Sequence, residues 1–212
     1  MQLIGMLDSA YVRRVAIALI VARTPFVHRP VSLFRHLDEF SKLNPLLKAP
    51  TLLVDDGTAL MDSSVILDYL AGVEPGIAAL TPSKAPDRLR AARVTGLALS
   101  VTEKAVQRHY ERMLRPAEKR HEPWTERVMG QLAAGLSALD AELPSSKWIA
   151  GELGLADISA VCAFTFAKNM LGDLVETGVY RRLAEFCARA EALPAFLAAP
   201  PQDGATASAI GG

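Results

Sequence analysis

The sequence predicts an α/β domain followed by an all-helical domain. Residues 1–73 alternate short strand patterns with helix patterns, in the order β-α-β-α-β-β-α. Residues 74–86 are rich in proline and lack periodicity, which is typical of a connection between domains. From Asp87 onwards the strand patterns vanish and helical spacing dominates. We therefore expect domains at residues 1–77 and 86–200, a linker at 78–85 and a flexible tail at 201–212.

The first half of the α/β domain contains two strands and two helices. Residues 2–6 form a short strand pattern, and apolar residues from Val12 to Ile20 then recur at helical spacing, with Arg13, Arg14 and Arg23 elsewhere. Residues 26–33 are rich in strand formers and include a proline, which cannot donate to a ladder. We therefore expect this strand at a sheet edge, followed by a short helix over residues 35–43.

The second half of the domain is a hairpin and a helix. Residues 51–54 and 58–61 flank Asp55-Asp56-Gly57, which places turn residues where a hairpin needs them. A helix pattern follows over residues 63–71.

The rest of the chain is helical. Helical spacing covers residues 87–114, 124–143 and 180–193, with a short piece around Phe196. The segment 155–171 is apolar on most sides, so we expect it to be the buried central helix. With Gly154 as its cap, Asp157 stands where a carboxylate can accept a hydrogen bond from the cap amide.

Composition excludes several classes of protein. The 212 residues carry 23 basic and 23 acidic side chains, so no basic excess indicates nucleic acid as a partner. Cys162 and Cys187 show no metal or redox spacing, and the four histidines show no i, i+4 pairing, so we expect no metal. A disulfide between the cysteines remains an alternative, although a reduced, cytoplasmic protein is the plainer interpretation. The N-terminus has no signal-peptide pattern, and the apolar stretch 15–22 is too short for a membrane span of about 20 residues.

Two segments point to a small acidic peptide as the ligand. Ala49-Pro50 precedes a short strand, where a proline can expose backbone for an extended peptide to pair with. Asp62-Ser63 opens a helix, and the unpaired N–H groups of a helix start can hold a carboxylate. An ordinary proline before a strand and an ordinary pair of capping residues are the plain alternatives.

Four segments together resemble the glutathione transferase family, and the resemblance covers nearly the whole chain. They are Ser9-Ala10-Tyr11-Val12-Arg13-Arg14-Val15, the run from Asn44 to Leu52, the run from Asp62 to Leu70, and Trp148-Ile149-Ala150-Gly151-Glu152 with Leu155-Ala156-Asp157-Ile158. Ala10, Ala49 and Gly154 depart from the usual proline, valine and Ser or Thr. The resemblance implies a thioredoxin-like first domain, a cytosolic homodimer of the serine type, and glutathione as the co-substrate.

The resemblance also implies roles for individual residues. Ser9 would stabilise the glutathione thiolate, although by itself it reads as a helix cap, and Tyr11 is the competitor for this role. The remaining glutathione contacts would be a cis peptide bond at Pro50 that turns the backbone of Ala49 outward, Asp62 for the ammonium, Ser63 for the γ-glutamyl carboxylate, and Lys48 with His36 for the glycyl carboxylate.

An electrophilic small molecule would bind between the domains. Tyr11 and one helical face with Glu103, Val106 and Tyr110 would line its pocket. Arg108, Arg112 and Arg115 are more simply interpreted as a solvated face than as a site for an anionic substrate.

The expected activity is conjugation of glutathione to this electrophile, as in detoxification. A binding or regulatory protein that kept the fold without the chemistry is one alternative. A glutathione-dependent reductase or isomerase is another, although reductases of this family generally have cysteine at the position of Ser9, and serine-type isomerases have a Ser-Ser-Cys run that is missing here.

Overall fold

The computed structural model describes residues 1–145, 147–173, 175, 178–202, 204 and 206, and forms two compact units. The first unit contains Met1–Thr81 and Glu191–Gly212, and the second contains Pro82–Ala190. The sequence placed residues 191–200 in the helical domain, whereas the structure places them in the first unit. The reason is a contact between segments far apart in the chain, since Arg13 donates hydrogen bonds to Glu191 and to the Ala199 carbonyl. Most of the expected tail at 201–212 lies outside the described residues.

A four-stranded sheet forms the centre of the first unit. Its strands are β1 (Gln2–Ile4), β2 (Val27–Arg29), β3 (Thr51–Leu53) and β4 (Ala59–Leu60), in the order β2-β1-β3-β4. β1 runs parallel to β2 and antiparallel to β3, and β4 is antiparallel to β3. The predicted hairpin is confirmed, and so is the edge position of the second strand.

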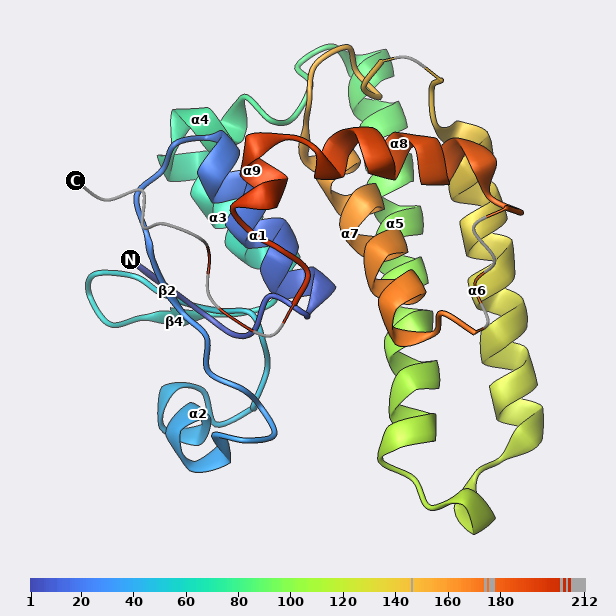
Figure 1. The fold of residues 1–212 in the computed structure, drawn as a ribbon. Helices are drawn as coiled ribbons and strands as arrows, with labels where there is room; N and C mark the ends of the chain where they lie inside the picture. Colours follow the sequence, from blue (N-terminus) through green and yellow to red (C-terminus); the bar gives the residue numbers. More distant parts are fainter. Residues whose placement is uncertain (146, 174, 176–177, 203, 205, 207–212) are drawn as a thin grey trace. The chain divides into compact units, whose positions relative to one another are not determined.

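Helices cover both faces of this sheet. α1 (Ala10–Val21) and α3 (Ser63–Val73) lie on one side, and α2 (Leu37–Leu43) lies on the other (Figure 1). Phe40 of α2 is fully buried in a cluster with Ile4 and Val31. The order of elements is the one the sequence predicts, and it places the starts of α1 and α3 after β1 and β4.

Part of the proline-rich segment 74–86 is helical. Residues Pro75–Ala78 form the short helix α4, in which Ile77 is fully buried. A Cβ on Gly76 would lie 2.7 Å from the Ala22 carbonyl oxygen, so glycine permits this close approach of α4 to the end of α1. α9 (Pro194–Leu197) completes the first unit.

The second unit is helical. Its elements are α5 (Ala85–Met113), the 3₁₀ turn η1 (Ala117–Lys119), α6 (Glu122–Glu142), α7 (Leu155–Met170) and α8 (Arg181–Glu191), whose last residue already belongs to the first unit. α5 packs against both α6 and α7, and α7 is buried along most of its length, as its composition predicts. Cys162 and Cys187 are buried and form no disulfide, and none of the described helices is long and apolar enough to cross a membrane.

Asp157 holds the start of α7 as the capping pattern predicts. Its Oδ2 accepts from the Gly154 N–H at 2.8 Å, and its Oδ1 accepts from the Ile149 N–H at 2.9 Å. Burial raises the pKa of Asp157 to about 6, and the two N–H donors partly oppose this rise. Asp157 therefore joins the loop before α7 to the first turn of that helix.

Candidate functional site

The starts of α1 and α3 both have capping residues. Ser9 caps α1, and its Oγ accepts from the Val12 N–H at 3.4 Å. Asp62 caps α3, and its Oδ1 accepts from the Ser64 N–H at 2.8 Å. A capped helix start still presents first-turn N–H groups and the positive end of the helix dipole. Both positions therefore combine the capping role with a geometry that favours an anion.

A buried arginine joins these two helices. Arg14 of α1 is 4% exposed, and its Nη1 donates to Ser63 Oγ at 3.0 Å and to Ser64 Oγ at 3.1 Å. Ser63 itself is 1% exposed. The sequence placed Arg14 off the apolar face of its helix and gave it no role, so this contact was missed. The sequence signal that could have indicated its burial is the position of Arg14 among small and apolar residues along α1.

Ala49 and Pro50 lie next to the first turn of α1. Their peptide bond is cis, as the resemblance implies. A Cβ on Gly5 would lie 2.6 Å from Val12 Cγ2 and 3.1 Å from Ala49 Cβ, so there is no room for a larger side chain at Gly5 between these two segments. The positive φ of 134° at Gly5 also favours glycine. In the described ranges no backbone hydrogen bond uses the N–H or C=O of Ala49.

Lys48 and His36, the two candidates for the glycyl carboxylate, are both exposed. The Lys48 carbonyl accepts from Asn44 Nδ2 at 3.2 Å and from Thr51 Oγ1 at 2.7 Å, and these bonds fix the turn before Pro50. His36 Nδ1 accepts from the Ser32 N–H at 3.1 Å. In the neutral ring this leaves Nε2 as the donor.

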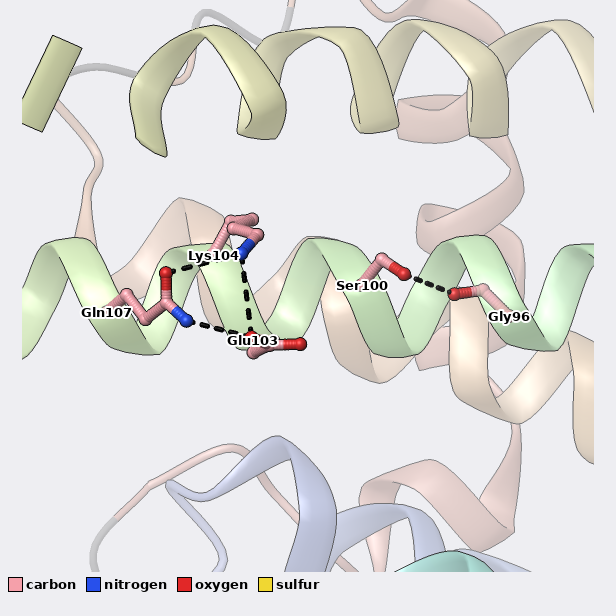
Figure 2. A network of polar contacts seen from close by, with 5 residues as sticks. All are labelled: Gly96, Ser100, Glu103, Lys104 and Gln107. Carbon is pink, nitrogen blue, oxygen red and sulfur yellow. Dashed lines mark hydrogen bonds and ion pairs between the residues drawn. The ribbon is translucent and has the colours of Figure 1, made fainter. Parts of the chain in front are cut away.

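The residues expected to line an electrophile pocket have different surroundings. Glu103 is exposed on α5, where its Oε1 accepts from Gln107 Nε2 at 2.8 Å and lies 3.5 Å from Lys104 Nζ (Figure 2). Val106 is half-buried on the same helix. Tyr11 is half-buried in the first turn of α1.

Tyr110 lines a hollow at the end of α5. The hollow has a volume of about 530 Å³, and its walls are Gln107, Tyr110, Glu111, Leu114, Arg115, Pro116, Lys119 and Trp124. Glu103 and Val106 are not among these residues. Arg115 Nε donates to Glu111 Oε2 at 2.9 Å, which ties one of the two cations to a carboxylate.

His28 links the sheet to the C-terminal segment of the first unit. Its Nε2 lies 2.8 Å from the Gly5 carbonyl oxygen, and its Nδ1 accepts from the Thr206 N–H at 3.0 Å. Burial lowers the pKa of His28, and the hydrogen bond to Gly5 opposes this shift. Among the described residues no group of three or more His, Cys, Asp or Glu could hold a metal ion.

Fold and sequence together define the family. Residues 3–76 match the family description "Glutathione S-transferase, N-terminal domain", and residues 122–189 match "Glutathione S-transferase, C-terminal domain". The chain belongs to the glutathione S-transferase family. A maleylacetoacetate isomerase of Pseudomonas aeruginosa is 31% identical over 200 residues, which are 89% of this chain and 90% of that protein.

Solved structures give the same result. A glutathione S-transferase of Methylobacterium radiotolerans, in complex with glutathione sulfonate, is 28% identical, with a TM-score of 0.85 over 92% of each chain. A glutathione S-transferase of Methylobacillus flagellatus with glutathione bound is 27% identical, with a TM-score of 0.86 over 95% of this chain and 99% of that one.

Proposed function

We propose that the protein is a glutathione transferase, which holds glutathione on its first unit and joins the glutathione sulfur to an electrophilic carbon. The observation that carries the proposal is the start of α3. There Asp62 caps the helix and Arg14 donates to the hydroxyls of Ser63 and Ser64. The similarity to two proteins whose structures contain glutathione or its sulfonate supports the same ligand.

Each end of glutathione has a candidate partner on this unit. The γ-glutamyl carboxylate accepts hydrogen bonds from the Ser63 hydroxyl and N–H, where the helix dipole also favours it. Its ammonium pairs with the Asp62 carboxylate. The cysteinyl backbone pairs with the N–H and C=O of Ala49, which are unused in the described backbone hydrogen bonds. Lys48 and His36 bind the glycyl carboxylate.

Activation of the thiol falls to the start of α1. A free cysteine thiol has a pKa of about 8.5, and a hydroxyl donor at a helix N-terminus favours the thiolate. Ser9 is the proposed donor and Tyr11 is its competitor. The thiol proton goes to solvent, the sulfur forms a bond to the electrophilic carbon, and the leaving group departs with its bonding electron pair. The protein contributes positioning and thiolate stabilisation.

The electrophile has candidates but no assigned chemistry. Tyr11, Glu103, Val106 and Tyr110 remain the residues proposed to contact it. Tyr110 has the strongest support, because it lines the hollow at the end of α5 together with Leu114 and Trp124.

A glutathione-dependent isomerase is the second candidate function. The 31% identical isomerase of P. aeruginosa favours it. Against it, the sequence at the start of α1 is Ser9-Ala10-Tyr11, without the cysteine that the resemblance leads one to expect in serine-type isomerases. Isomerisation would also use the glutathione thiolate, so both candidates need the same site on the first unit.

One set of assays separates these functions. The purified protein is titrated with glutathione by calorimetry, then assayed for conjugation with 1-chloro-2,4-dinitrobenzene and for isomerisation of maleylacetoacetate. We expect binding and conjugation, both reduced by Ser63→Ala. Isomerisation without conjugation would replace the transferase by the isomerase. No heat of binding at millimolar glutathione would favour a binding or regulatory protein that kept the fold without the glutathione chemistry.

The resemblance also supports a cytosolic homodimer. Light scattering coupled to size-exclusion chromatography tests the dimer, which predicts a mass of about twice 22.8 kDa. A mass of one chain at micromolar concentration would contradict it.

A further inference from the structure

Arg14 lies in an unusual electrostatic position. It is a buried cation whose guanidinium donates to the two serines at the N-terminal end of α3. That end of the helix already carries a positive partial charge, so a second positive charge there works against the helix dipole. Asp62, the cap of α3, supplies one negative charge. The stability of α3 alone therefore gives no reason to place a buried arginine at this end.

The contact also fixes what the serine hydroxyls can do. A serine hydroxyl has one proton to donate and two lone pairs that accept. Because the Oγ atoms of Ser63 and Ser64 accept from Arg14, their protons remain available for another acceptor. A guanidinium also keeps its charge at every pH in the physiological range. Arg14 thus turns two hydroxyls into oriented donors at a positive helix end, which is an arrangement suited to a carboxylate.

We propose that Arg14 is a positioning residue for the γ-glutamyl carboxylate of glutathione and acts through Ser63 and Ser64. This inference rests on the proposed function, because it concerns the same ligand site. We infer in addition that Arg14 contributes to the affinity for glutathione through that carboxylate, so a ligand without the carboxylate should bind equally well with or without Arg14.

The neighbouring arginine provides a matched control. Arg13 is equally buried, at 1% exposed, and stands on the same helix. Its partners are different, because it donates to both oxygens of Glu191 and to the Ala199 carbonyl, and it lies over the ring of Phe196. Arg13→Met removes a buried guanidinium from α1 but leaves the serines of α3 untouched.

The experiment compares two ligands and four proteins. The ligands are glutathione and 4-aminobutyryl-cysteinylglycine, which differs from glutathione only in lacking the γ-glutamyl carboxylate. The proteins are the wild type, Arg14→Met, Arg14→Lys and Arg13→Met, each checked for folding by its melting temperature. Calorimetry gives the dissociation constants, and the ratio between the two ligands isolates the carboxylate in each protein.

We expect the wild type to prefer glutathione by about tenfold or more, the size of a lost hydrogen bond to a charged group. Arg14→Met reduces this preference to less than about threefold, Arg14→Lys retains part of it, and Arg13→Met retains all of it despite a lower melting temperature. In steady-state kinetics Arg14→Met raises KM for glutathione and leaves kcat nearly unchanged.

Three results would overturn the inference, and they are distinguishable from one another. If the wild type binds neither ligand, the proposed function fails and the inference fails with it. If the wild type prefers glutathione while folded Arg14→Met or Arg14→Lys keeps the full preference, the glutathione site is supported, but Arg14 does not contribute to binding the carboxylate. An equal loss of preference in Arg13→Met would show that the loss of any buried arginine from α1 is sufficient.

Discussion

Replacing Ser9 by alanine removes a hydroxyl that caps α1 and that, in the proposed mechanism, donates to the glutathione sulfur. The two roles differ in size. The capping bond to the Val12 N–H is 3.4 Å long, beyond the usual range for such bonds, so its loss belongs at the low end of the capping scale, about 0.5 kcal/mol. A hydrogen bond to a charged group contributes about 1.5–3 kcal/mol.

The larger role sets the expected result. At about 1.36 kcal/mol for each pKa unit, loss of the donor raises the pKa of the bound thiol by about one to two units. Turnover near neutral pH therefore falls about ten- to a hundredfold in Ser9→Ala. The affinity for glutathione stays nearly unchanged, because the carboxylate, ammonium and backbone contacts are intact.

The assay measures the thiol pKa directly. The ultraviolet absorbance of the thiolate is followed against pH in the complex with glutathione, and the pH dependence of kcat/KM is recorded beside it. Ser100→Ala is the control, because the Ser100 hydroxyl on α5 of the second unit donates to the Gly96 carbonyl at 2.9 Å, and Ser100 is not among the residues proposed to bind either substrate (Figure 2). An unchanged thiol pKa with only a small loss of stability would refute the argument and leave Ser9 as a cap, with Tyr11→Phe as the next variant to measure.

Three further predictions follow from individual contacts. Ser63→Ala should weaken glutathione binding by about ten- to a hundredfold in calorimetry, because it removes a donor to a charged group, and an unchanged dissociation constant would move the carboxylate elsewhere. Asp157→Ala leaves the buried Ile149 N–H and the half-buried Gly154 N–H without their acceptor and should lower the free energy of unfolding by about 2–4 kcal/mol. An unmoved midpoint in a denaturant titration would contradict this. Because the pKa of His28 is lowered in the folded protein, the unfolded chain binds a proton more readily, and this residue lowers the free energy of unfolding as pH falls below about 6.5. His28→Gln should therefore make the free energy of unfolding depend less on pH in this range. An identical pH dependence in the variant would disprove the assignment.

The order of elements could be predicted because its signals are local. Pro30 marks an edge strand, Asp55-Asp56-Gly57 marks a tight turn, and Asp157 stands three residues after its helix cap. Each of these depends on a few neighbouring residues, so the chain carries the information within a short window. The cis bond at Pro50 came from the resemblance, since few X-Pro bonds are cis.

What the sequence missed depends on partners far along the chain. Arg13 is buried because Glu191 lies beside it, and Arg14 is buried because Ser63 accepts from it, at separations of 178 and 49 residues. Burial of an arginine depends on such partners, which periodicity cannot identify. The same long-range contact explains why residues 191–200 belong to the first unit. The helix α4 was missed because its proline resembled a linker signal, although Pro at the first helical position is common.

A crystal structure of the protein with glutathione bound tests the central claim most directly. We expect the γ-glutamyl carboxylate at the hydroxyls and N–H groups of Ser63 and Ser64, the cysteinyl backbone paired with Ala49, and the sulfur within hydrogen-bonding distance of Ser9. Glutathione bound elsewhere, or a first turn of α3 that makes no contact with the ligand, would contradict it.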